Sequence, residues 1–144
     1  ANTDLDRAGK QLASIRERVD KHQDDDTRLV DLKVEAEALN RSILAISIAT
    51  RPRLDAIKAR QTELGDSPAE GAPAEADVVV EERKKLAAER NQINALTGEA
   101  ENLSIEATKL SNRVCASIGY SACQSGPKST GKPAQNCAAY TASS

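Results

Sequence analysis

The feature that most constrains this chain is an apolar residue at every seventh position of residues 79–114. Such a repeat keeps one narrow apolar stripe along an α-helix, and that stripe packs against other helices rather than around a wide core. The stripe consists of Val79, Leu86, Ile93, Ala100, Ala107 and Val114, with Leu96, Leu103 and Leu110 at the intermediate positions.

Three residues of the same helix depart from the apolar, helix-favouring pattern. Glu82 and Glu89 take the intermediate positions in the first turns, so we expect that end of the helix to be hydrated and loosely packed. Gly98 lies inside the helix, where glycine costs about 1 kcal/mol relative to alanine. We therefore expect a neighbouring helix to approach closely at Gly98.

Composition favours the same thin packing. The 144 residues include no Phe, Trp or Met, and both tyrosines lie in the last quarter of the chain. A globular core normally takes much of its bulk from aromatic side chains. With 29% charged residues and Leu, Ile, Val and Ala as the packing residues, the chain has the composition of a coiled coil.

Two further helices precede the repeat. Residues 5–22 carry one apolar stripe at helical spacing, and residues 26–64 carry a longer one. An aspartate among residues 24–26 is expected to cap the second helix. The segment "SILAISIA" (42–49) is apolar on nearly all sides, so we expect the first and third helices both to lie against it. Pro52 is expected to kink the second helix, with a loop at 50–53 as the alternative.

A spacer rich in Pro, Gly and Ala joins the second and third helices. Gly65 is expected to end the second helix, and Pro68 and Pro73 prevent its continuation. The third helix is expected over 75–114. The chain is therefore predicted to be all-α: an elongated antiparallel three-helix coiled-coil bundle over residues 1–114.

Residues 115–144 differ from the rest of the chain. They show no heptad repeat, are rich in Ser, Gly and Ala, and contain every cysteine: Cys115, Cys123 and Cys137. We expect a disordered tail, and the abrupt change raises the hypothesis that it is not native to the domain. A disulfide between two of the cysteines is left open.

The sequence argues against several functions. A net charge of −2 without a basic stripe disfavours a nucleic-acid partner. No apolar run approaches the roughly 18 residues of a membrane span. The cysteine spacings match no zinc site, and His22 is the only histidine. We expect no enzymatic activity, no metal, no cofactor and no small-molecule substrate.

Residues 51–114 closely resemble an N-terminal domain of unknown function found on large bacterial mechanosensitive channels of the small-conductance (MscS) family. The motifs lie at the end of the second helix, in the spacer and at the start of the third helix; residues 5–50 fit more loosely, and the tail departs from the family. The matching residues are Arg53, Leu54, Lys58, Arg60, Leu64 and Gly65; Pro68, Ala69, Glu70, Gly71, Ala72, Pro73 and Glu75; and Glu82, Arg83, Leu86, Glu89 and Arg90.

The resemblance implies a non-catalytic periplasmic module, the soluble part of an inner-membrane protein. Its partner would be the channel portion of the same polypeptide, and a homo-oligomer is left open. The module would serve assembly, sensing or partner contact. The alternative is a free-standing coiled-coil adaptor or chaperone-like binder that uses residues 42–49 or the spacer.

Candidate interaction residues follow from where a rigid scaffold places its loops, since loops carry function more often than the scaffold. In the spacer they are Glu70, Gly71, Pro73 and Glu75. Arg51 and Arg53, on either side of Pro52, are the next candidates, because a kink exposes backbone carbonyls.

Overall fold

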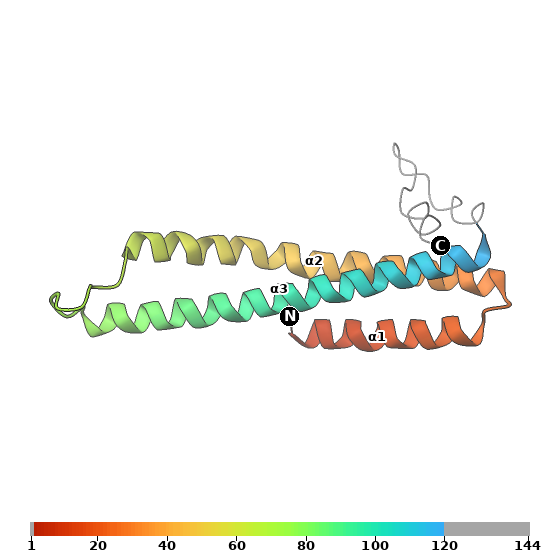
Figure 1. Ribbon diagram of the computed structural model, residues 1–144, viewed down its shortest axis with the longest axis horizontal. Coiled ribbons are helices and arrows are strands. Elements are labelled where there is room, and N and C mark those ends of the chain that lie inside the picture. The colour runs from red at the N-terminus through yellow and green to blue at the C-terminus, as the bar shows by residue number, and fades with distance from the viewer. Residues whose placement is uncertain (1, 120–144) are drawn as a thin grey trace, which may run out of the picture.

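Three helices form an elongated antiparallel bundle in a computed structural model that describes residues 2–119 (Figure 1). They are α1 (Asn2–Lys21), α2 (Asp26–Leu64) and α3 (Asp77–Ile118). The last two lie side by side along the whole rod, and α1 covers the half remote from the α2–α3 loop. The predicted all-α, three-helix architecture is confirmed, and residues 2–119 include no strand.

The helix ends differ slightly from those expected. The first helix begins at Asn2 rather than at residue 5 and ends one residue earlier, at Lys21, and α3 begins at Asp77 rather than at residue 75. The cap of α2 is Asp25, whose side chain accepts a hydrogen bond of 3.1 Å from the Arg28 amide.

The C-terminal end of α3 corrects the predicted start of the tail. The helix continues to Ile118, and Cys115, expected to open the tail, is buried at 4% exposure and disulfide-bonded. Cys115 follows Val114 at the end of the apolar stripe, so its small side chain extends the packing surface. The remainder of the predicted tail, residues 120–144, lies outside the described residues.

Most of the apolar core lies in the three-helix half. The stripe of α1 is buried between α2 and α3, and both longer helices bury their own stripes there. The core of this half contains Leu5, Leu12, Ile15, Val19, Leu29, Leu32, Leu39, Ile43, Leu96, Leu110 and Val114, with four alanines between them.

The half beside the spacer is packed more loosely. Between residues 44 and 95, Ile57 is the one buried hydrophobic residue, at 0% exposure. Val79, Leu86 and Ile93 are only half-buried, since no third helix covers this half. The looser packing predicted from Glu82 and Glu89 is thus observed.

A small polar layer joins α2 to α3 inside the three-helix half. Ser104 Oγ lies 2.6 Å from Asn40 Oδ1, and Asn40 Nδ2 lies 3.4 Å from Thr108 Oγ1. Because polar groups at a helix seam are satisfied in only one alignment, such a layer favours a single register. Ion pairs hold α1 against both longer helices. Arg16 pairs with Glu106 and Asp20 with Arg113, both on α3, and Arg18 pairs with Glu35 of α2.

The second helix is continuous through Pro52, which excludes the predicted alternative of a loop at 50–53. Pro52 lacks an amide hydrogen, so the Ile48 carbonyl loses its usual helical donor. Both residues are exposed, so water can hydrate that carbonyl. A proline on the solvent side therefore leaves the helix intact.

Two packing expectations are wrong. Residues 42–49 are not buried on several sides: Ile43 is fully buried, but Leu44 and Ile48 are 42% and 67% exposed. The first and third helices flank the buried side of α2 and leave its opposite side open to solvent. Gly98 has no atom within 4 Å of where a Cβ would stand, so no neighbouring helix approaches it.

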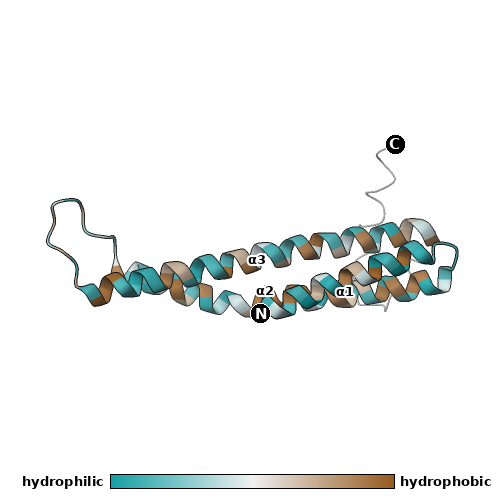
Figure 2. Ribbon diagram, turned by 90° about the horizontal axis from the view of Figure 1, so that it is seen from below, coloured by the Kyte–Doolittle hydropathy of each residue, from teal (hydrophilic) through white to brown (hydrophobic). Residues whose placement is uncertain are grey.

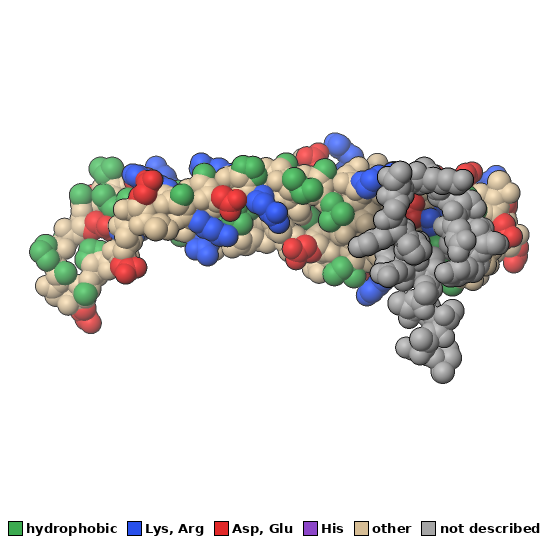
Figure 3. All heavy atoms as spheres, turned by 90° about the horizontal axis from the view of Figure 1, so that it is seen from above, with side chains coloured by type: hydrophobic (Ala, Val, Ile, Leu, Met, Phe, Trp, Pro, Cys, Tyr) green, Lys and Arg blue, Asp and Glu red, His purple; other side chains and the backbone are tan. Residues whose placement is uncertain are grey.

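Hydropathy alternates along all three helices (Figure 2). Within residues 2–119, none of the helices combines the length and apolar character that a membrane span requires. Acidic and basic side chains are distributed along the rod with hydrophobic ones between them (Figure 3). No large region of a single charge sign is visible on this face.

Candidate functional site

The spacer, residues 65–76, forms the tip of the α2–α3 hairpin (Figure 1). Gly65 ends α2 with a positive φ of 66°, and its amide donates to the Thr62 carbonyl at 3.1 Å. Within the spacer the Ala72 amide donates to the Ala69 carbonyl at 3.0 Å, which closes a turn. Gly71 occupies the third position of this turn with φ of 90°, a conformation that side-chain-bearing residues rarely adopt.

Arg83 of α3 holds both ends of the spacer. Its guanidinium donates to the Leu64 and Gly65 carbonyls at 2.8 and 2.7 Å, where the last turn of α2 leaves carbonyls without helical donors. It also binds the Glu75 carboxylate at 2.8 Å, close to the start of α3. The side chains of Arg83 and Glu75 are only 20% and 18% exposed. One arginine thus connects the end of one helix to the residues that precede the next.

Cross-helix ion pairs continue from the spacer along the loosely packed half. Arg60 binds Glu82 at 2.7 and 3.1 Å, and Arg53 binds Glu89 at 2.6 and 2.7 Å. Both pairs are bidentate, the geometry that best matches a guanidinium to a carboxylate. Their hydrogen bonds hold the pKa values of Glu82 and Glu89 below the usual glutamate value. The two glutamates in the apolar stripe therefore bridge the helices instead of leaving them apart.

The predicted interaction residues are not brought together into one site. Glu70, Gly71 and Pro73 lie exposed in the spacer. The Arg51 side chain is exposed and forms no hydrogen bond or ion pair within residues 2–119. It lies about a dozen residues before the end of α2, roughly 20 Å from the spacer at the helical rise per residue.

Two of the predicted residues have structural partners. Glu75 binds Arg83, and Arg53 binds Glu89. Sequence reasoning did not include Arg83 and Arg60 among the interaction residues, although a signal was present for Arg60. Arg53 and Arg60 are seven residues apart, as are Glu82 and Glu89, so an antiparallel hairpin aligns both pairs at once.

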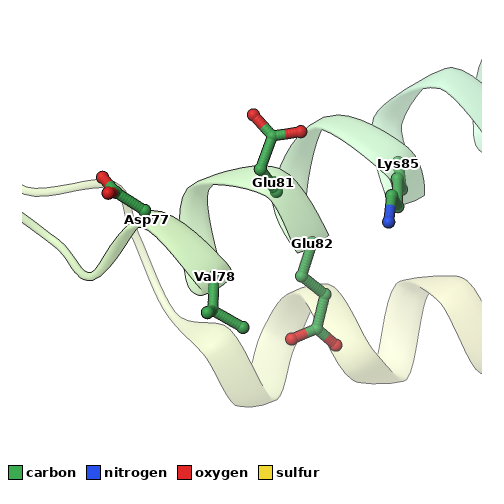
Figure 4. A pocket seen from close by; sticks show the side chains of 5 residues that line it. All are labelled: Asp77, Val78, Glu81, Glu82 and Lys85. Atoms are coloured by element: carbon green, nitrogen blue, oxygen red, sulfur yellow. The ribbon is translucent and has the colours of Figure 1, made fainter.

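A shallow, open hollow lies on the first turns of α3, lined by Asp77, Val78, Glu81, Glu82 and Lys85 (Figure 4). Its carboxylates do not converge: Glu82 points toward α2, where it binds Arg60, and Glu81 points away. Val78 is 79% exposed. Among the residues described, no group of three or more His, Cys, Asp or Glu is arranged to hold a metal ion.

Comparison with known proteins adds no relative: no protein-family model, curated protein or solved structure matches the chain. The arginine–carboxylate pairs at the tip and along the adjoining half of the hairpin are already satisfied within the hairpin. This arrangement is suited to holding a shape.

Proposed function

We propose that this chain is a non-catalytic periplasmic module of a mechanosensitive ion channel of the MscS family. In that role it is the soluble part of an inner-membrane protein and contributes to assembly, sensing or partner contact. The action is mechanical: a rod of roughly 60 Å, the length of a 42-residue helix, presents its tip at a defined distance from the channel portion.

The observation that supports the proposal is how the residues of the resemblance are used. Arg53 pairs with Glu89, Arg60 with Glu82, and Arg83 with Glu75, and all six belong to the matching motifs. These motifs are far apart in the sequence and bond to one another across the hairpin. The resemblance thus covers one structural unit, and a protein that shares these residues has the means to build the same hairpin.

The proposal is tested in two steps. The genomic reading frame that encodes residues 2–119 is expected to encode a channel with membrane-spanning helices as well. In that channel, Arg53→Glu breaks the pair with Glu89, and patch-clamp recording is expected to show a shifted pressure threshold for opening. The double variant Arg53→Glu/Glu89→Arg re-forms the pair with reversed polarity and is expected to restore the threshold.

Two outcomes would reject the channel module. One is a reading frame without membrane-spanning helices. The other is a threshold that stays unchanged when residues 2–119 are deleted, because a module with no effect on assembly or opening has no mechanical role.

A second candidate, a free-standing coiled-coil adaptor or chaperone-like binder, is favoured by the exposure of Leu44 and Ile48 on α2. Exposed apolar side chains of this size can bind unfolded segments. The adaptor would suppress aggregation of a heat-denatured test protein, and Ile48→Glu would abolish that effect. The channel module requires no such activity.

A further inference from the structure

The outer side of α2 carries an apolar surface that no other part of residues 2–119 covers. Val34, Leu44 and Ile48 are 51%, 42% and 67% exposed. They lie opposite the buried side of the helix, which contains Ala36, Ile43 and Ile57. We call this surface the α2 outer face and define it by residues 34, 41, 44, 48, 52 and 55.

Charged residues interrupt this face in a regular way. Arg41 lies seven residues before Ile48, and Asp55 lies seven residues after it, so the three align along the helix. Arg41 and Asp55 are both exposed, and within the described chain neither has an ion-pair partner. Other charged side chains of the rod, such as Arg53 and Arg60, are paired.

Two copies of the α2 outer face are complementary in charge and apolar character when they pack antiparallel. If a second α2 runs antiparallel with Ile48 at the two-fold axis, Ile48 meets its own copy, and Leu44 meets Pro52. Arg41 then faces Asp55 of the other copy, and the symmetry repeats that ion pair on the far side of the axis. A two-fold interface requires such reciprocal contacts.

Two other alignments are less favourable. A parallel pairing in register would place Arg41 against Arg41 and Asp55 against Asp55. An antiparallel pairing centred two residues earlier would place Arg41 opposite Arg51 and Glu37 opposite Asp55. Like charges placed directly opposite each other disfavour an interface.

We infer that the α2 outer face binds a second copy of this chain, antiparallel and centred on Ile48. The face from Val34 to Asp55 extends over roughly 32 Å at 1.5 Å per residue, enough for several turns of side-by-side packing. The inference does not depend on the proposed channel, because it uses only contacts between copies of this chain.

The test is the molar mass of the full chain by sedimentation equilibrium, over a wide range of concentration and without reductant, so that the disulfide of Cys115 stays intact. Non-reducing gel electrophoresis shows whether any disulfide joins two chains. The expected species at high concentration is a dimer with twice the chain mass of 15.3 kDa. Ile48→Glu places two carboxylates at the axis and should raise the dissociation constant on the order of a hundredfold. Ile105→Glu is the matched control: Ile105 is 53% exposed, lies on α3, and should leave the dimer unchanged.

Charge exchange tests the orientation. Arg41→Glu alone and Asp55→Arg alone each turn two attractive pairs into repulsive ones and should weaken the dimer on the order of tenfold. The double variant Arg41→Glu/Asp55→Arg should restore it. A monomer at all concentrations overturns the inference, as does a dimer that tolerates Ile48→Glu or is lost with Ile105→Glu. Failure of the double variant to restore the dimer rejects the antiparallel register. Circular dichroism shows whether each variant keeps its helices.

Discussion

Two isoleucines of α2 allow the packing of the two halves to be compared directly. Ile43 and Ile57 are both fully buried, but Ile43 belongs to the three-helix core, and Ile57 lies where only α2 and α3 meet. Replacing either with alanine removes three carbon groups from the interior. At about 0.8 kcal/mol each, the lost transfer free energy is about 2.4 kcal/mol in both cases.

The two substitutions differ in the cavity that remains. Around Ile43, three helices hold the walls apart, and an unfilled cavity brings the total loss for Ile43→Ala to about 4 kcal/mol. Around Ile57, half-buried neighbours can move inward and water can enter from the uncovered side. We therefore expect Ile57→Ala to lower the free energy of unfolding by only about 2.4 kcal/mol.

The assay is urea unfolding followed by circular dichroism, at one protein concentration so that any self-association affects all variants equally. Ile105→Ala serves as the exposed control and should change stability by less than about 0.5 kcal/mol. Equal losses at the two buried positions, or a larger loss at Ile57, would refute the argument that the half beside the spacer is more loosely packed.

Three further predictions concern single residues and pH. Gly98→Ala should stabilise the chain by about 1 kcal/mol, because α3 gains helix propensity where a methyl group meets open space; a lower melting temperature would contradict this. Arg83→Met removes the bonds to Glu75 and to the end of α2, so limited proteolysis should cut the spacer faster. The helical circular dichroism signal should stay the same. Unchanged cleavage would show that the spacer holds its shape without Arg83. The pKa values of Glu82 and Glu89 are lowered in the folded chain, so their ion pairs stabilise it above the unfolded glutamate pKa, and this stability is lost as the pH falls through the lowered values. Acid unfolding should therefore become less steep in Arg53→Met, which lacks the pair with Glu89. An identical pH profile would count against the pair.

The elements of the fold could be predicted from the sequence because each helix encodes its own buried stripe. Leu12 and Val19 on α1, and Ala100 and Ala107 on α3, are buried as their spacing requires. Gly65 ends α2 at the residue expected. Such signals are local, and a single helix carries them regardless of its neighbours.

The errors arose where the number of neighbours decides burial. Leu44 and Ile48 are apolar, but α2 has only two neighbouring helices, and neither lies on that side. The expected close approach at Gly98 failed for the same reason. Apolar character indicates that a side chain can be buried, but it does not indicate how many helices are present to cover it.

The candidate site was predicted only in part. The spacer was located correctly, but Glu75 and Arg53 proved to be partners of Arg83 and Glu89. Pairing across two helices depends on their alignment, which the pattern of either helix alone does not contain. The regular spacing of the two arginines and the two glutamates was the available signal.

The short first helix also determines how the rod responds to a sideways load. Arg18 pairs with Glu35 of the antiparallel α2, so Asn2, sixteen residues earlier, lies level with residue 51. The cross-section of the rod therefore narrows from three helices to two beside Pro52, and α2 also lacks one backbone hydrogen bond there. The two-helix part is expected to be less stiff than the three-helix part. When a rod that is held at its thicker end is loaded at its thinner end, the thinner part bends most next to the point where the thickness changes. A force applied at the spacer is therefore expected to bend the rod most strongly beside Pro52, and the three-helix half is expected to bend less.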